Sequence, residues 1–183
     1  MKILGISGTI TGSKTLIVIN QVVDQIKQIY PEAEVEVLDL KQYDVQFCDG
    51  RHPSQYSGDT RKVIDKVISA DTYVIGTPIF QGSMSGTLKN LIDLVPPSDF
   101  KHKIMGFVAT AGNHQHYLAI ENQLMPIARY LKTYVPPSFV FAHNDHFNSQ
   151  NEIVTHELLE QIELFSRQIV HMGKNLQHSK KLI

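Results

Sequence analysis

The apolar residues of this chain follow two patterns that alternate from one end to the other. Short apolar runs are typical of buried strands, and alternation of apolar with polar residues is typical of a strand with one wet face. Segments with these patterns span residues 2–6, 34–40, 71–77, 103–110 and 138–142. Between them lie apolar stripes spaced three and four residues apart, which predict amphipathic helices. The predicted helices run from residue 13 or 14 to about 30, then over 60–70, 88–95, 115–132 and a last segment whose stripe extends from Leu158 to Leu176.

Prolines and capping residues set the expected boundaries of these elements. Pro31 follows the first helix. Pro126 lies inside the fourth helix and predicts a kink or a split there, because it has no N–H to donate. Ser149, with Glu152 three residues later, resembles a capping box at the start of the last helix. Residues 41–59 show no periodicity and contain several glycine and proline breakers, so they are predicted to be a loop.

Strands that alternate with helices predict an α/β fold, in which a parallel sheet is covered by helices on both faces. A length of 183 residues suits one domain spanning residues 1–183. Ligands of such folds bind where the carboxyl ends of the strands meet. The candidate site is therefore formed by the loops that follow the first, third and fourth strands, at residues 7–13, 77–86 and 110–116.

Composition and charge narrow the classes of protein to consider. Hydrophobic residues make up 42% and charged residues 19% of the chain, which excludes a mainly disordered protein. The net charge of −1 offers no electrostatic reason to expect a nucleic-acid or membrane partner, and is less negative than suits an electron carrier that docks on basic proteins. No apolar stretch approaches the ~18 residues of a membrane span, and the first residues lack the features of a signal peptide. The lone Cys48 cannot form an intrachain disulfide, which favours a reducing cytoplasm.

The first candidate loop carries hydroxyl groups and glycines directly before a helix, in the sequence Ser7-Gly-Thr-Ile-Thr-Gly-Ser-Lys-Thr15. A helix N-terminus presents N–H donors and the positive end of the helix dipole, which suits a phosphate. The hydroxyls add neutral donors, and Lys14 adds a positive charge. The loop therefore predicts a phosphate site, best suited to a phosphate monoester. The plainer alternative is that Ser13 simply caps the helix.

Other chemistries fit these residues less well. The glycine fingerprint of dinucleotide-binding folds is absent. Gly8 and Gly12 are separated by three residues, where the phosphate loop of an NTPase needs four, and Lys14 follows a serine instead of a glycine. Cys48 has no base nearby in the sequence that would make it a nucleophile. His114 with His116, and His143-x-x-His146 with Asp145, could each be imagined as metal ligands, but neither group has thiolate support or a known zinc spacing, so no metal site is expected.

The second and third candidate loops offer a surface for a flat ligand. In the second, Pro78 restricts the backbone, while Gly82 and Gly86 allow a ligand to approach it closely. Its alternative interpretation is an ordinary turn between a strand and a helix. The third loop, which begins at Thr110, supplies small and polar groups that could bind the second edge of a heterocycle.

The second loop also carries a long motif, Thr77-Pro-Ile-Phe-Gln-Gly-Ser-Met-Ser-Gly-Thr-Leu-Lys-Asn-Leu-Ile-Asp93. It resembles the T-P-x-Y-x-x-S-x-S-G-x-L-K-N-x-x-D motif of the NADPH-dependent FMN reductase family, and the order of elements is similar along almost the whole chain. Phe80 keeps the ring of the family's tyrosine and lacks its hydroxyl. The first loop departs from the family's G-S-x-R-x-x-S, since Ile6 replaces the glycine and Thr9 replaces the arginine. Lys14 could supply the positive charge of the missing arginine.

The resemblance implies a flavodoxin-like three-layer sandwich, a five-stranded parallel sheet of order 2-1-3-4-5, and an FMN site built from all three loops. The residues that it implies for the FMN phosphate are Ser7, Thr9, Ser13, Lys14 and Thr15. Those implied for the isoalloxazine ring are Pro78, Ile79, Phe80, Gln81, Gly82 and Ser83. Those implied for the pyrimidine side of the ring are Thr110, Gly112, Asn113 and His114.

The resemblance further implies hydride transfer from NADPH or NADH to FMN, with no protein acid or base, followed by electron transfer to free flavin, a quinone, an azo dye or ferric iron. A flavin-dependent monooxygenase is a possible recipient of reduced flavin, and family members are usually homodimers or homotetramers. The apolar Leu88, Leu91, Ile92 and Val95 would suit an interface helix or plain core. The alternatives that stay open are a flavodoxin-type electron carrier and, less favoured, a P-loop-like NTPase.

Overall fold

The computed structural model of the 183-residue chain describes residues 1–180, so the last three residues of the predicted 1–183 domain lie outside the described part. The strands are β1 (Lys2–Ser7), β2 (Glu34–Asp39), β3 (Thr72–Phe80), β4 (Ser83–Met84), β5 (Ile104–Ala111) and β6 (Val140–His143). The α-helices are α1 (Lys14–Ile29), α2 (Gly58–Ser69), α3 (Gly86–Leu94), α4 (Pro97–Phe100), α5 (Met125–Tyr130) and α6 (His156–Lys180). None of the helices in this part of the chain is long and apolar enough to cross a membrane.

The sheet has the predicted topology with one short addition. Five parallel strands lie in the order β2-β1-β3-β5-β6, which is the expected 2-1-3-4-5 when the parallel strands are numbered along the chain. The addition is β4, which pairs antiparallel with the end of β3. The register places Ser7 of β1 opposite Gly76 of β3, and Ala111 of β5 opposite His143 of β6. The loops that follow these strands therefore emerge side by side.

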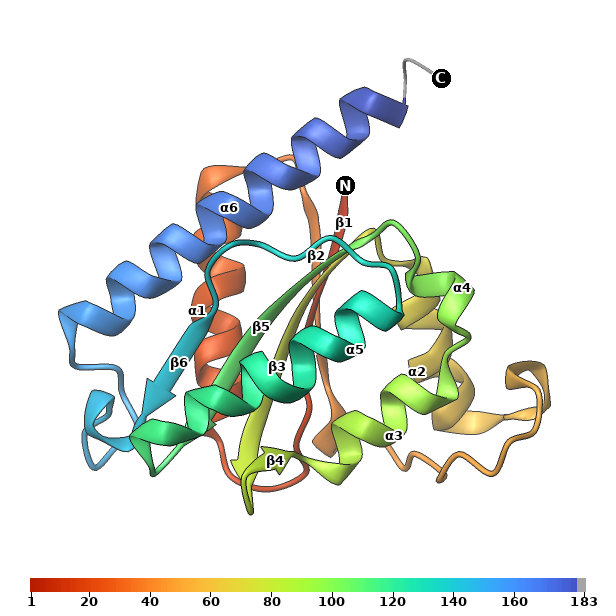
Figure 1. The fold of residues 1–183 in the computed structure, drawn as a ribbon, viewed down its shortest axis with the longest axis horizontal. Coiled ribbons are helices and arrows are strands. Elements are labelled where there is room, and N and C mark those ends of the chain that lie inside the picture. The colour runs from red at the N-terminus through yellow and green to blue at the C-terminus, as the bar shows by residue number, and fades with distance from the viewer. Residues whose placement is uncertain (181–183) are drawn as a thin grey trace.

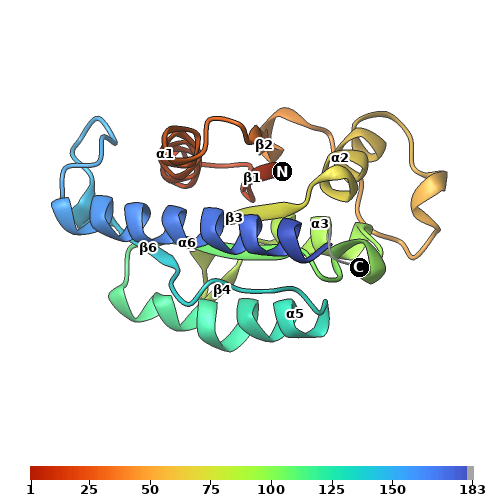
Figure 2. The same ribbon diagram turned by 90° about the horizontal axis from the view of Figure 1, so that it is seen from above.

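Helices cover both faces of the sheet, which confirms the predicted layers (Figures 1 and 2). On one face, α1 and α6 pack around Ile19, Val74 and Phe165. On the other, α2, α3 and α5 pack around Leu4, Tyr73 and Leu88. The apolar positions of α3, expected to be either interface or core, are buried in this second cluster. Gly106 of β5 shows how close α6 lies, because a Cβ there would be 2.5 Å from the ring of Phe165.

The predicted helix over 115–132 is split, as Pro126 led us to expect. A 3₁₀ turn over His114–Tyr117 comes first, then two α-helical residues and a π-helical turn over Ile120–Leu124, and α5 follows directly. Pro126 is the second residue of α5, so the helix changes from π to α directly before the residue that lacks an N–H. The wider π turn therefore accommodates a proline that a continuous helix would not.

Two sequence interpretations were wrong in detail. Ser149 and Glu152 do not begin the last helix, since α6 starts at His156. Instead, the side-chain oxygen of Asn148 accepts hydrogen bonds from the amides of Gln150 and Glu152 and closes a loop. The predicted loop over 41–59 contains the 3₁₀ turn Pro53–Gln55 and the start of α2. Short polar residues stabilise turns as readily as helix caps, and sequence spacing alone does not separate the two.

Candidate functional site

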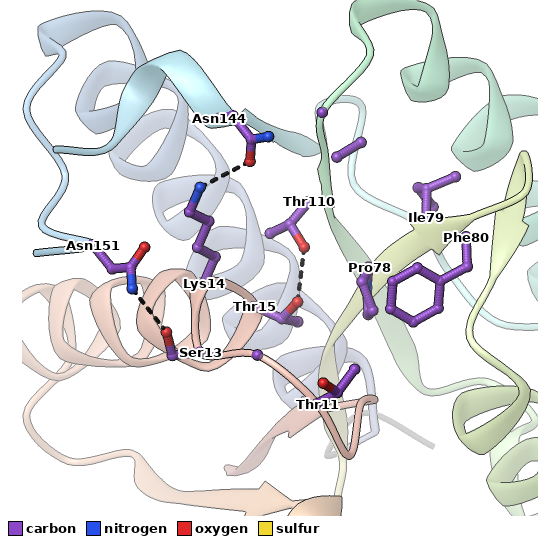
Figure 3. A pocket seen from close by; sticks show the side chains of 13 residues that line it. Thr11, Ser13, Lys14, Thr15, Pro78, Ile79, Phe80, Thr110, Asn144 and Asn151 are labelled. Atoms are coloured by element: carbon purple, nitrogen blue, oxygen red, sulfur yellow. Dashed lines mark hydrogen bonds between the residues drawn. The ribbon is translucent and has the colours of Figure 1, made fainter. Parts of the chain in front are cut away.

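A pocket of about 410 Å³ lies at the carboxyl edge of the sheet, where the site was predicted (Figure 3). It is lined by residues from the loop before α1, the end of β3, the end of β5 and the loop after β6. Its volume lies in the range of small-molecule and cofactor sites. Of the predicted site residues, the pocket brings together Ser13, Lys14, Thr15, Pro78, Ile79, Phe80, Thr110 and Gly112.

The N-terminus of α1 is open toward this pocket. Ser13 occupies the N-cap position, yet its side chain makes no capping hydrogen bond, and the first turn of α1 carries no acidic residue. The plain-cap alternative for Ser13 is therefore wrong. The first N–H groups of a helix have no partner within it, so those of α1 are available to an anion. The Ser13 hydroxyl accepts a hydrogen bond from Asn151 (3.3 Å), which leaves its own proton available as a donor.

Lys14 brings a positive charge that no carboxylate among residues 1–180 neutralises by a direct ion pair. Its Nζ donates to the side-chain oxygen of Asn144 (2.8 Å) and lies 5.0 Å from the centre of the Phe147 ring. Both partners are neutral, so they hold the ammonium group in place without cancelling its charge. Together with the uncapped helix, Lys14 forms a donor set that suits a phosphate.

Two buried hydroxyls join the first loop to β5. Thr15 Oγ1 and Thr110 Oγ1 are 2.8 Å apart, and both residues are almost fully buried. This hydrogen bond fixes the start of α1 against the end of β5 at the base of the pocket (Figure 3).

Pro78, Ile79 and Phe80 form an apolar wall of the pocket at the end of β3 (Figure 3). The Phe80 residue is 49% exposed, so about half of its surface is accessible at this wall. Directly after it, β3 turns back into β4 through Gln81 and Gly82, both with positive φ (51° and 76°). Two such residues in a row match the tight turn that two-residue hairpins favour.

The hairpin is braced from two sides. Gln123, on the π turn, accepts a hydrogen bond from the Ser83 hydroxyl (2.6 Å) and donates one to the Gly82 carbonyl (2.8 Å). Ser85 accepts from the Leu88 amide (3.1 Å) and so caps α3, and its hydroxyl donates to the Gly8 carbonyl. These contacts tie the second loop to the first. They therefore fix the distance between the apolar wall and the N-terminus of α1.

Seven predicted site residues do not line the pocket. Ser7 and Thr9 are buried, and the Thr9 hydroxyl exchanges hydrogen bonds with the backbone of Thr11. Their predicted phosphate contacts gain no support from this arrangement. Gln81, Gly82 and Ser83 form the hairpin tip just outside the pocket. Asn113 caps the 3₁₀ turn after β5 by accepting from Gln115, and His114 stacks on His143.

Five lining residues were absent from the predicted set, namely Thr11, Gly12, Ala111, Asn144 and Asn151. Asn144 directly follows β6, so the rule that identified the other loops would have found it had it been applied to the fifth predicted strand. Asn151 lies seven residues further along, in a loop whose path no local pattern indicates.

The donor set and the wall together fit FMN. An open helix N-terminus with an unneutralised lysine suits a phosphate monoester, and an apolar wall next to it suits a flat ring. The fold and this site define a flavodoxin-like α/β protein with a cofactor-sized pocket at the carboxyl edge of its sheet.

Solved structures support the fold. NADH:FMN oxidoreductase (EMOB) in its apo form superposes with a TM-score of 0.75 at 19% identity, over 92% of this chain and 89% of that chain. A flavodoxin from the domain Archaea gives 0.64 at 15% identity, over 97% and 100% of the two chains. At these identities the likeness concerns the fold alone.

Sequence relatives show the family. A protein of Geobacillus thermodenitrificans (strain NG80-2), named NAD(P)H-dependent FAD/FMN reductase, is 54% identical over 176 residues, which are 96% of this chain and 95% of that protein. The sequence profile of NADPH-dependent FMN reductase matches residues 1–147. The chain therefore belongs to the NADPH-dependent FMN reductase family, as its second-loop motif led us to expect. It is an oxidoreductase, and FMN and NAD(P)H are the cofactors of its family.

Proposed function

We propose that this protein is an NAD(P)H-dependent FMN reductase that passes electrons from reduced nicotinamide, by way of FMN, to a small-molecule acceptor. The observation that carries the proposal is the uncapped N-terminus of α1, which lies beside the unneutralised Lys14 and opposite the apolar wall of β3. Family membership supports the same reading.

In this proposal the phosphate is held by the first amides of α1, the Ser13 hydroxyl and the Lys14 ammonium group. The wall of Pro78, Ile79 and Phe80 supports the ring and excludes water from one face of it. The hairpin, held by Gln123 and Ser85, keeps that wall at a fixed distance from these phosphate donors. The fixed distance orients the ring. The chemistry that FMN supplies when bound is hydride acceptance from the nicotinamide and electron delivery to the acceptor.

No residue of the chain needs to act as an acid or base in this scheme. The lining consists of neutral side chains, glycines and one lysine. The protein therefore contributes position and electrostatics.

Finer features also belong to the proposal. We expect free flavin, quinones, azo dyes or ferric iron as acceptors, a flavin-dependent monooxygenase as one recipient of reduced flavin, and NADPH or NADH as donor. We expect a homodimer or homotetramer in the cytoplasm. Two core clusters on the two faces of one sheet support a single domain over 1–183.

The test is an absorbance spectrum of the purified protein with FMN, followed by addition of NADPH without oxygen. Bleaching of the flavin band, and steady NADPH oxidation once an acceptor is added, are the expected results. A protein that neither retains nor reduces FMN would overturn the proposal.

A flavodoxin-type electron carrier is the second candidate, since the archaeal flavodoxin shares the fold. A carrier would bind FMN yet oxidise NADPH only when a partner reductase is present. The same assay therefore separates the two functions. Magnesium-dependent ATP hydrolysis by the protein would instead favour the P-loop alternative, which nothing in the family match supports.

A further inference from the structure

Next to the pocket, the structure brings His114 together with His143 and Asp145, which form a different group of candidate ligands in the sequence. His114 follows β5, while His143 ends β6 and Asp145 lies on the turn after it. Their ligand atoms all lie within 4.8 Å of one another. Nδ1 of His143 is 3.1 Å from Oδ2 of Asp145, and Nε2 of His114 is 3.8 Å from the same oxygen.

His143 is the fixed member of this cluster. It is 7% exposed, and its Nδ1 accepts a hydrogen bond from the Asp145 amide (3.2 Å). That contact uses the single lone pair of Nδ1, so a metal ion would bind there by taking the place of the Asp145 amide hydrogen. Nδ1 also lies 3.1 Å from the Asp145 carboxylate oxygen, a contact that is favourable only when a proton or a metal ion lies between the two atoms.

A proton or a metal ion could meet that need, and the third group favours the metal. A proton on Nδ1 satisfies His143 and Asp145 only, whereas a metal ion also engages Nε2 of His114. Bonds of about 2.0–2.1 Å in a tetrahedral site place neighbouring ligand atoms about 3.3 Å apart. The observed separations of 3.1 and 3.8 Å bracket that value.

His114 has the freedom needed to complete such a site. Its ring is stacked on that of His143, with centres 3.7 Å apart and planes 17° apart, so the His114 ring must rotate before both rings can bind one ion. The His114 side chain is 73% exposed and that of Asp145 is 78% exposed. A rotation of the exposed ring therefore turns its nitrogen toward the shared oxygen without disturbing the core.

We propose that His114, His143 and Asp145 form a binding site for one divalent transition-metal ion such as Zn²⁺, with open positions toward solvent. Two imidazoles and one carboxylate are a ligand set that such ions prefer. The site shares its loop with Asn144, which lines the pocket and holds Lys14. The proposal does not depend on the flavin chemistry, so it can fail or succeed separately.

The test is a calorimetric titration of the full-length, tag-free protein with Zn²⁺ at pH 8, after treatment with a chelator and its removal. One saturable equivalent per chain is expected. His114→Ala and Asp145→Asn should each weaken binding by at least about tenfold, because each removes one of three ligands.

The chain offers a matched control in His156, whose Nε2 lies 3.2 Å from Glu160 and whose side chain is 84% exposed. This pair has a histidine and a carboxylate at the same separation but lacks a third ligand in the described part of the chain. His156→Ala should leave the titration unchanged. Absence of a saturable equivalent in the unmutated protein would overturn the proposal. The proposal would also be overturned if His114→Ala and Asp145→Asn bound Zn²⁺ as tightly as the unmutated protein. The same holds if His156→Ala weakened binding as much as they do.

Discussion

The loops that precede α1 and α3 look alike in sequence and differ in what their polar groups do. Both are rich in glycine and hydroxyl residues, and both end in a serine at the N-cap position, Ser13 and Ser85. Ser85 caps its helix and also donates to Gly8, whereas Ser13 caps nothing. The Ser85 hydroxyl is therefore used to build the protein, while the proton of the Ser13 hydroxyl is available to a ligand. The state of the hydrogen bonds, and not the hydroxyl content, distinguishes a binding loop from a structural one.

Replacing Ser85 should reduce the free energy of unfolding more than any other substitution considered for these two loops. Ser85→Ala removes the cap of the Leu88 amide and one of the two hydrogen bonds to the Gly8 carbonyl, the other of which comes from Thr87, so we expect a loss of about 1–2 kcal/mol of unfolding free energy. Denaturant unfolding measures it. A loss below about 0.5 kcal/mol would show that the second loop is not held by this residue.

Lys14→Ala should weaken FMN binding about 10- to 100-fold, because a charge-assisted contact to the phosphate is lost. The free energy of unfolding should change little. Fluorescence titration of FMN measures the dissociation constant. Lys27→Ala is the matched control, since Lys27 lies on the same helix and pairs with Asp24 on the surface. Equal FMN affinity in Lys14→Ala and Lys27→Ala would contradict the assignment of Lys14 to the FMN phosphate.

Gln123 should act as a positioning residue for the hairpin. Gln123→Ala removes two hydrogen bonds to Gly82 and Ser83, so we expect FMN binding and the rate of flavin reduction by NADPH to fall about three- to tenfold, by loosening the wall next to the ring. Anaerobic stopped-flow reduction measures the rate. Gln123→Glu keeps an acceptor for Ser83 but sets a carboxylate against a carbonyl, so it should be no better than alanine. Unchanged rates of flavin reduction in Gln123→Ala and Gln123→Glu would exclude this positioning role.

Replacing Ser13 should have the smallest effect on stability. Because its hydroxyl caps nothing, Ser13→Ala should change the unfolding free energy by less than about 0.5 kcal/mol, in contrast to Ser85→Ala. FMN affinity should fall several-fold through loss of one neutral donor. A destabilisation as large as that of Ser85→Ala would remove the distinction between the two loops.

Local patterns predicted the elements of the fold well, because a buried strand and an amphipathic helix each impose their own spacing on the sequence. The split at Pro126 was predictable for the same reason, since a missing N–H is a property of one residue. The start of α6 was not, because Asn148 uses its side chain to close a turn where the spacing of Ser149 and Glu152 suggested a cap. The motif over residues 77–93 indicated the family directly.

The sequence by itself determined the order of strands and helices, the family, and the edge of the sheet where the loops meet. Only the tertiary structure decided which side chains at that edge are satisfied and which remain available. It buried Ser7 and Thr9, brought Asn144 and Asn151 to the pocket, and joined His114 to His143 and Asp145. The physical reason is that strand spacing is a local property, whereas a hydrogen bond between residues more than a hundred positions apart depends on how the sheet register aligns their loops.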